Sequence, residues 1–157
     1  MKLTFILIFC VGVAAAVVSC SRADTFAEIN TDAEGTALKG FDAVAYFTVS
    51  NAVRGNQSYE FVWNGARWRF ANAENLGRFK ADPAAFAPQF GGYCSYAVSR
   101  GYTADGDPRA WKVVDGKLYL NYDLNVKEKW EQDQKENIDK ASENWAKFKT
   151  KQPEHKG

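Results

Sequence analysis

The sequence predicts an α+β domain, in which two β-hairpins form a small antiparallel sheet, short helices lie between them, and a long C-terminal helix packs across the sheet. Three features predict this fold class. Asn64-Gly65 separates two alternating runs, Asp115-Gly116 separates two more, and apolar residues recur at helical spacing after residue 125. Asn-Gly and Asp-Gly are strong hairpin signals because both positions of a two-residue turn need a positive φ.

The first hairpin joins residues 59–63 to residues 66–70. A two-residue turn sets its register and predicts three cross-strand pairs: Trp63 with Ala66, Phe61 with Trp68, and Tyr59 with Phe70. All six side chains fall on one face, and the opposite face carries Glu60, Arg67 and Arg69. Turn chemistry and hydrophobic pattern therefore specify the same register.

The second hairpin joins residues 111–114 to residues 117–120. Its register pairs Val113 with Leu118 and Trp111 with Leu120, so that the large apolar residues again share a face. Between the hairpins, Asn72 is expected to cap a helix whose inward face is Ala73, Leu76 and Phe79. Asp82-Pro83 has the pattern of an N-cap followed by proline, and Gly91-Gly92 precedes a short helix over 93–99.

The last predicted element is one long amphipathic helix. Asn125 and Glu128 resemble a capping box. The apolar positions that follow at helical spacing are Val126, Trp130, Ile138, Ala141, Trp145 and Phe148, with a polar gap at Gln134. The helix is expected to pack on the sheet, and residues 150–157 are expected to form a tail.

The N-terminus has the pattern of a bacterial lipoprotein signal peptide over residues 1–19. Lys2 precedes an uncharged apolar run that is too short for a comfortable membrane span, and Ser19-Cys20 ends it. An aliphatic residue, a small residue and then cysteine resemble the bacterial lipobox, so Cys20 is predicted to carry lipid. Residues 20–37 are then a tether, and the domain over 38–149 faces the periplasm from the outer membrane if the cell has two membranes.

Removal of this signal leaves a chain that is poor in reactive side chains. The sequence has three cysteines and one histidine; Cys10 leaves with the signal and Cys20 carries lipid. Cys94 is then the sole free thiol, so no intramolecular disulfide can form. Loss of Lys2 takes the formal charge from +1 to zero, which gives no reason to expect a nucleic-acid partner.

Several separated motifs then resemble the YHS domain family, in particular its exported bacterial members. They are Gly40-Phe41-Asp42-Ala43-Val44-Ala45-Tyr46-Phe47, Trp63-Asn64-Gly65-Ala66, Trp68-Arg69-Phe70, Phe79-Lys80-Ala81-Asp82-Pro83 and Ala87-Pro88-Gln89-Phe90-Gly91-Gly92-Tyr93-Cys94. The similarity continues through Trp111, residues 115–120 and Trp145. The resemblance implies a distant relation to TRASH-type metal modules, some of which handle copper or heavy metals.

The resemblance carries over only Cys94 as a metal ligand. The cysteine that metal-binding members have near the start of the domain is replaced here by the stretch over 40–43. Zinc needs four ligands and Cu(I) prefers thiolates, so one protomer cannot build such a site, although two could share copper through a Cys94 from each. Metal binding, copper or another soft ion, and a homodimer are therefore one alternative.

A second alternative is thiol chemistry, with Cys94 acting in a redox sensor or a thiol enzyme. Gly91-Gly92 places Cys94 in the first turn of a short helix, where the helix dipole should lower the thiol pKa. A catalytic nucleophile would still need a base, and no histidine lies in the expected folded part.

The leading hypothesis is a non-catalytic binding module in the cell envelope, attached to the membrane by its lipid. Its partner would be a small ligand or another envelope protein. The candidate site residues are Cys94, Tyr93, Tyr96, Tyr46, Asp42 and Tyr102. The tyrosine rings can line a pocket for a flat ligand. Plain core packing explains them less well than it explains Trp63 and Trp111, because tyrosine hydroxyl groups need partners or water.

Overall fold

The computed structural model describes residues 26–151 and 154–156. The predicted signal peptide and Cys20 lie outside the described residues. The strands are β1 (Asn56–Trp63), β2 (Ala66–Phe70), β3 (Asp107–Val114) and β4 (Lys117–Asn121). The helices are α1 (Ala45–Thr48), α2 (Ala73–Ala81), α3 (Pro83–Phe86), α4 (Ser95–Ser99), α5 (Leu124–Gln132) and α6 (Gln134–Phe148), with 3-10 segments η1 (Leu38–Gly40) and η2 (Gln89–Gly92).

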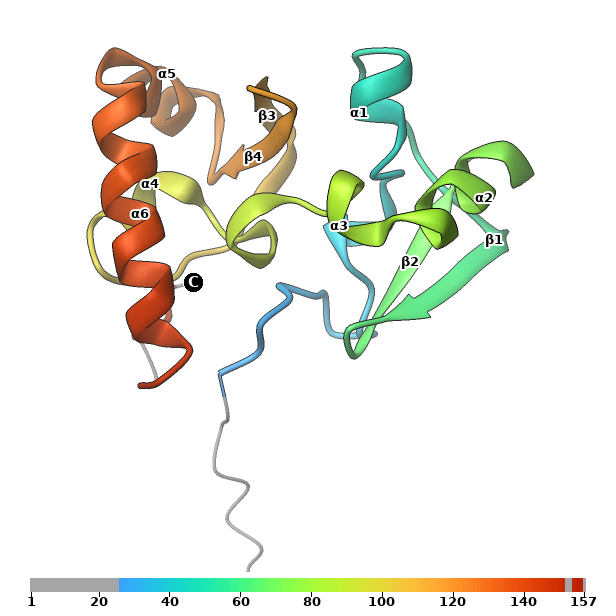
Figure 1. The fold of residues 1–157 in the computed structure, drawn as a ribbon, viewed down its shortest axis with the longest axis horizontal. Coiled ribbons are helices and arrows are strands. Elements are labelled where there is room, and N and C mark those ends of the chain that lie inside the picture. Colours follow the sequence, from blue (N-terminus) through green and yellow to red (C-terminus); the bar gives the residue numbers. More distant parts are fainter. Residues whose placement is uncertain (1–25, 152–153, 157) are drawn as a thin grey trace, which may run out of the picture.

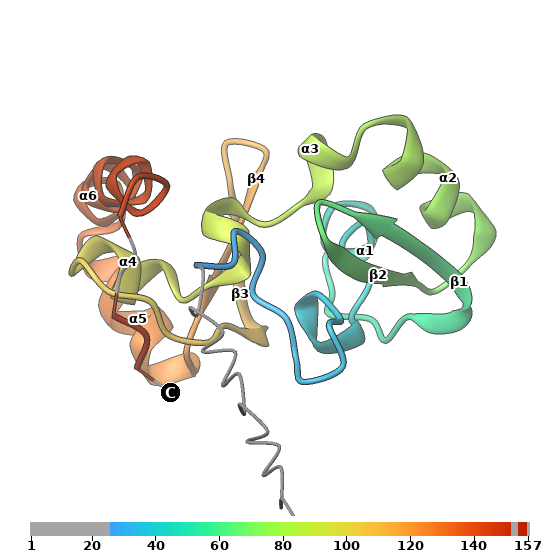
Figure 2. The same cartoon turned by 90° about the horizontal axis from the view of Figure 1, so that it is seen from below.

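The predicted α+β class is confirmed, with the hairpins arranged as two separate two-stranded antiparallel sheets rather than as one sheet. The first hairpin lies with α1 and α2 at one end of the molecule, and α4, α5 and α6 form the other end (Figure 1). The second hairpin lies between them, as the view from below also shows (Figure 2). Among the described residues, no helix has both the length and the apolar composition needed to cross a bilayer.

The first hairpin has the predicted register at its turn and departs from it farther away. Trp63 pairs with Ala66 and Phe61 with Trp68, as expected. The predicted pairing of Tyr59 with Phe70 is wrong, because Phe70 pairs with Asn56 and the register shifts between Asn56 and Glu60. A shift of this kind inserts extra residues into one strand and bends it. Just before β1, the chain passes so close to β2 that a Cβ at Gly55 would overlap the backbone of Arg69.

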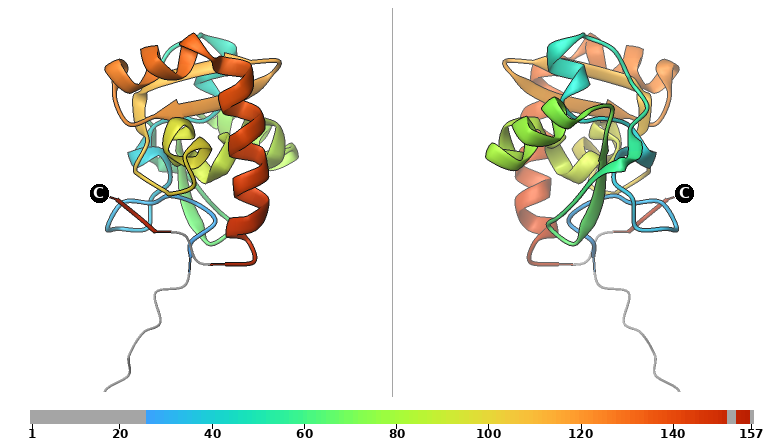
Figure 3. Two further views of the ribbon diagram at one scale, coloured as in Figure 1. Left: turned by 90° about the vertical axis from the view of Figure 1, so that its left-hand side faces the viewer. Right: turned by 90° about the vertical axis from the view of Figure 1, so that its right-hand side faces the viewer.

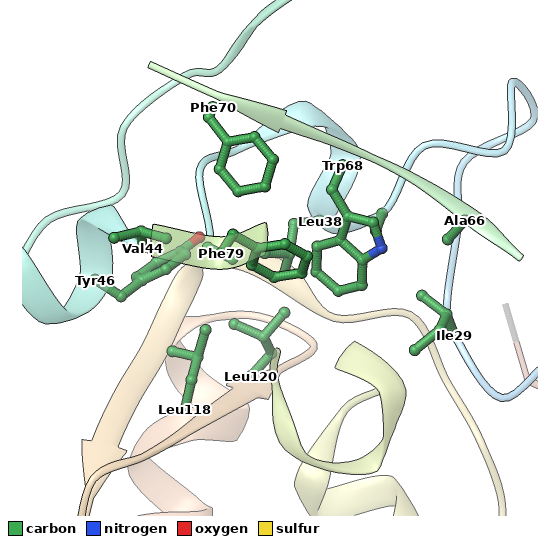
Figure 4. Packing of buried hydrophobic residues seen from close by; sticks show 12 residues of the cluster. Ile29, Leu38, Val44, Tyr46, Ala66, Trp68, Phe70, Phe79, Leu118 and Leu120 are labelled. Atoms are coloured by element: carbon green, nitrogen blue, oxygen red, sulfur yellow. The ribbon is translucent and has the colours of Figure 1, made fainter. Parts of the chain in front are cut away.

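The second hairpin has the predicted register, with Val113 opposite Leu118 and Trp111 opposite Leu120. Leu118 and Leu120 are buried and point toward the first hairpin and Phe79 (Figure 4). The two sheets share no backbone hydrogen bonds between strands. Side-chain burial therefore joins them, through the hydrophobic effect rather than through pairing.

An aromatic cluster forms the centre of this core. Phe79 of α2 is fully buried, and its ring centroid lies 5.0 Å from that of Trp68 and 4.9 Å from that of Phe70. Phe61 and Trp63 of β1 meet the same ring edge-on. Burial of side chains of this size stabilises the fold by about 1.5–3 kcal/mol each.

Helix α2 begins where it was expected and buries a different face. Asn72 caps it, because its side-chain oxygen accepts a hydrogen bond from the Asn75 backbone N–H at 2.8 Å. Phe79 is buried and Leu76 half-buried, whereas Ala73 is exposed and Asn75 is buried in its place. The Asn75 side chain turns inward because a buried carboxylate, that of Asp42, accepts its N–H at 2.7 Å.

The predicted C-terminal helix is two helices, α5 and α6, broken at Asp133. Asp123 caps α5, with the Val126 N–H at 2.7 Å, so the cap expected at Asn125 lies two residues too late. The break falls beside the polar gap at Gln134. The buried Asn137 side-chain amide bridges the break, because it donates a hydrogen bond to the carbonyl of Trp130 at 3.0 Å.

Helix α6 packs against α4 rather than across the sheet. Asn137 accepts a hydrogen bond from the Ser99 hydroxyl at 3.3 Å, and Asn144 donates to the carbonyls of Val98 and Ser99 at the end of α4. The Val98 carbonyl also accepts from the Gly101 N–H at 3.0 Å, so Asn144 adds a donor from α6 to the last carbonyls of α4. Figure 3 shows α6 along the outside of this end of the molecule, with α5 across its top.

Both terminal segments pack on the domain within the described residues, which differs from the expected tether and tail. Ile29 is buried, and the Asn30 N–H donates to the Gly91 carbonyl at 2.8 Å. At the other end, Thr103 donates its N–H to the Glu154 carbonyl and accepts from the Lys156 N–H, both at 2.8 Å. Residues 154–156 therefore run along the loop that contains Thr103.

Candidate binding pocket at Cys94

A pocket of about 310 Å³ opens beside Cys94. Its lining comes from α4 and its N-cap, the loop after α4, the residue that follows β4, α5 and the C-terminal segment. The lining residues are Cys94, Tyr96, Ala97, Tyr102, Ala104, Tyr122, Val126, Lys129 and Lys156. Cavities of this size hold drug-sized ligands, usually between apolar walls with a few polar groups. Three of the six predicted site residues, Cys94, Tyr96 and Tyr102, therefore lie together.

Backbone contacts with two segments distant in sequence hold Cys94 in place. Its N–H donates to the carbonyl of Ala104 at 2.8 Å, and it forms a parallel bridge with Leu120 of β4. Gly91 and Gly92 precede it with φ of 61° and 82°, in the left-handed region that glycine adopts without strain. A Cβ at Gly91 would overlap the backbone of Glu28, so glycine also lets the N-terminal segment pack here.

The environment of Cys94 favours the thiol over the thiolate. Cys94 stands at the N-cap of α4 instead of in its first turn, and its side chain is 1% exposed. Burial raises the pKa of the thiol, and the backbone N–H groups of Ala97, Tyr122 and Tyr96 only partly offset this. The expected lowering of the pKa is therefore reversed, since desolvation outweighs the N–H groups. A nucleophilic thiolate is not favoured near neutral pH.

Asn121 links the sulfur to the start of α4. Its side-chain oxygen accepts hydrogen bonds from the Cys94 Sγ at 3.9 Å and from the Tyr96 backbone N–H at 3.2 Å. Asn121 is fully buried, and its amide nitrogen has no hydrogen-bond partner within the described part of the chain. The hydroxyl of Ser95, the residue after Cys94, is also buried without a hydrogen-bond partner among the described residues. Unsatisfied buried polar groups are rare in proteins, so this concentration beside the pocket is unusual.

Aromatic rings with nearby cations form the pocket walls. The Lys156 ammonium lies 4.6 Å from the centre of the Tyr102 ring. The Arg100 guanidinium lies 4.7 Å from the centre of the Tyr96 ring and donates to the Tyr96 hydroxyl at 3.3 Å. Such cation–π contacts restrict the rings and place positive charge at the rim.

Tyr93 and Tyr46, also predicted for the site, lie elsewhere. The Tyr93 hydroxyl donates to the Ala27 carbonyl at 3.0 Å, and its ring packs among Phe26 and Trp145. The Tyr46 hydroxyl donates to the Pro108 carbonyl at 2.8 Å, and its ring meets Trp111 edge-on. Tyr46 borders a different, more open pocket of about 560 Å³.

Asp42 is a structural residue in this geometry. It is fully buried, and its two carboxylate oxygens accept four N–H groups. The donors are the backbone of Val44 at 2.8 Å, Ala45 at 3.3 Å and Ala71 at 2.8 Å, and the side chain of Asn75 at 2.7 Å. The carboxylate thus joins the segment before α1 to the end of β2 and to α2, and leaves little capacity for a ligand.

Comparisons with known proteins do not assign the chain to a family. It matches no model of a protein family, no curated protein and no solved structure. The resemblance to YHS domains therefore stays a prediction from the motifs, and the chain's function has to be inferred from the pocket.

The predicted site residues did not include six lining residues of the pocket: Ala97, Ala104, Tyr122, Val126, Lys129 and Lys156. Val126 and Lys129 are three residues apart, so helical spacing alone could have placed them on one face. Nothing in the sequence indicates that this face turns toward Cys94. Lys156 reaches the pocket only because residues 154–156 pair with Thr103.

Ligands for a metal do not gather at Cys94. Within residues 26–151 and 154–156, no group of three or more His, Cys, Asp or Glu side chains is placed to hold an ion. His155 is held outside this pocket, with Nδ1 2.9 Å from the Thr103 hydroxyl and Nε2 3.5 Å from the Asp105 carboxylate. Among these residues, Cys94 therefore lacks the further side-chain ligands that a zinc site in one protomer would need.

Proposed function

We propose that the chain is a non-catalytic binding module of the cell envelope, a lipid-anchored domain of the YHS type that takes a small molecule in the Cys94 pocket. One observation carries the proposal. Three predicted site residues converge with segments distant in sequence on one pocket with aromatic, small apolar and cationic walls. A pocket of this composition suits a ligand with an apolar body and a polar end.

The chemistry of the lining supports binding rather than catalysis. Burial keeps the Cys94 pKa above its usual value, so the sulfur is a poor nucleophile near neutral pH. Within the described part of the chain, the lining contains no histidine and no carboxylate to serve as a general base. The thiol-enzyme alternative therefore has less support than binding.

The copper alternative also has less support. Two protomers could share an ion only if each sulfur reached the surface, and the Cys94 side chain is 1% exposed. Exposing it would break its contact with Asn121 and open the backbone bridge to Leu120. Binding in the pocket requires no such rearrangement.

The pocket is tested with three naphthalene probes: 2-naphthoate, 2-naphthol and 2-naphthylmethylammonium. We expect at least one probe to bind the purified protein and to shift the NMR signals of Cys94, Tyr102 and Val126. Val126→Trp should fill the half-buried rim and weaken that binding by about tenfold or more, since a filled cavity admits no ring.

The matched control is Val49→Trp, which adds the same ring at a position that is 62% exposed and outside the pocket. It should bind the probe as the wild type does. The proposed function is wrong if none of the three probes binds, or if Val126→Trp binds as well as Val49→Trp while both variants stay folded by circular dichroism.

The envelope anchor is tested in cells that express the full chain and are fed labelled palmitate. We expect the label to enter the wild-type protein and to be lost in Cys20→Ala, because Cys20 is the residue that the lipobox pattern exposes for lipidation. Cys10→Ala, within the same signal, should keep the label. Label that persists in Cys20→Ala would contradict a lipid anchor at this residue.

A further inference from the structure

Charge in the Cys94 pocket is one-sided. Among the residues that the structure describes, Lys129 and Lys156 are the charged residues of its lining, and none of the lining residues is acidic. Lys129 forms no ion pair with any residue that the structure describes. Lys156 lies 3.9 Å from the Glu154 carboxylate, but both side chains are largely exposed, and such pairs contribute little in water. The pocket therefore offers positive charge that its own lining does not neutralise.

The two ammonium groups are attached to different parts of the fold. Lys129 lies one turn after Val126 on α5, which forms one wall. Lys156 belongs to the C-terminal segment that pairs with Thr103, and its ammonium lies over the Tyr102 ring. An anionic group that enters between these elements can meet both cations.

The rest of the lining suits a flat apolar body. Tyr96, Tyr102 and Tyr122 supply rings, and Ala97 and Ala104 are small enough to leave space between them. Tyr122 is 48% exposed, and the nearby Leu124 is 61% exposed. They are two of the four large hydrophobic residues exposed in the described part of the chain. Aromatic walls with an exposed apolar rim favour a planar ring, which stacks offset or edge-on against tyrosines.

We propose that the ligand of this pocket is a small organic anion with a planar apolar body, such as an aromatic carboxylate. Its ring lies among the three tyrosines, and its anionic group meets Lys129 and Lys156. This inference rests on the proposed function, since it names the class of molecule that the same pocket takes. The buried sulfur of Cys94 contributes to the apolar surface and makes no covalent bond to the ligand.

The test compares the same three probes by isothermal titration calorimetry, because they share a ring system and differ in charge. We expect 2-naphthoate to bind about fivefold more tightly than 2-naphthol, which is the upper end of what one exposed ion pair provides. The cation 2-naphthylmethylammonium should bind most weakly. The preference for the anion should shrink as NaCl is raised, since salt screens exposed charges.

Lysine variants locate the charge. Lys129→Gln and Lys156→Gln should each reduce the affinity for 2-naphthoate and leave that for 2-naphthol unchanged, and the double variant should abolish the preference. Lys147→Gln, on an exposed position of α6 outside the pocket, is the matched control and should behave as the wild type. Equal binding of 2-naphthoate and 2-naphthol would overturn the anion inference and leave the proposed function standing. Failure of all three probes would remove the proposed function itself.

Discussion

Replacing Asp42 with alanine is expected to lower the free energy of unfolding by about 3–5 kcal/mol, the range found when one partner of a buried charged network is removed. The fully buried carboxylate accepts N–H groups from the backbone of Val44, Ala45 and Ala71 and from the Asn75 side chain. Alanine would leave these donors without partners and out of water. Each unsatisfied buried donor costs about 1–3 kcal/mol, so the upper part of the range is reached if few of them find water.

The measurement is urea unfolding followed by circular dichroism. Asp42→Asn keeps the size of the side chain but replaces an acceptor oxygen with a donor, so it should also destabilise the protein. Asp82→Ala is the comparison, because Asp82 caps α3 through one exposed hydrogen bond and its loss should cost only about 1 kcal/mol. If Asp42→Ala lowers the free energy of unfolding no more than Asp82→Ala does, the Asp42 carboxylate does not hold the three segments together.

Replacing Phe79 with alanine is expected to lower the free energy of unfolding by about 3–5 kcal/mol, the usual cost of removing a buried phenylalanine. Phe79 is fully buried and its ring contacts those of Trp68 and Phe70, while Phe61 and Trp63 meet it edge-on. The cavity cannot close easily, because its walls belong to a hairpin whose register the Asn64-Gly65 turn holds.

The same unfolding experiment measures this loss, and near-UV circular dichroism reports the packing of the tryptophans. Leu76→Ala on the same helix is the matched control, since Leu76 is only half-buried and should cost clearly less. A Phe79→Ala protein as stable as the Leu76→Ala protein would mean that the aromatic cluster is not a centre of the core.

The hairpins were predictable because their signals are local. In each, a two-residue turn and the alternation around it specify the same register, and the pairs nearest both turns are as expected. The shift between Asn56 and Glu60 was not predictable, since it depends on how closely Gly55 approaches Arg69. The break at Asp133 was visible in the sequence only as a polar gap. Asn137 bridges the break by a hydrogen bond to the Trp130 carbonyl, and it is held there by a contact with Ser99 of α4 that the sequence does not reveal.

The candidate site, like the fold, was predictable only in part. Cys94, Tyr96 and Tyr102 could be grouped from sequence because they lie close together in the chain, and the structure places all three on one pocket. Asp42 was also a candidate site residue. Its four hydrogen bonds show that it holds the fold together. A sequence lists the groups that could act in a site, but burial and partners decide which are free to do so.

By itself the sequence determined the fold class, the two turns with their nearest pairs, and the supply of chemistry: one thiol and one histidine beyond Cys20. Only the tertiary structure decided that the hairpins form separate sheets, that the Cys94 pKa is raised, and that Lys129 and Lys156 reach the same pocket. The physical reason is range. Turns and periodicity act between near neighbours in the chain, whereas desolvation and the convergence of charges depend on segments that meet only after folding.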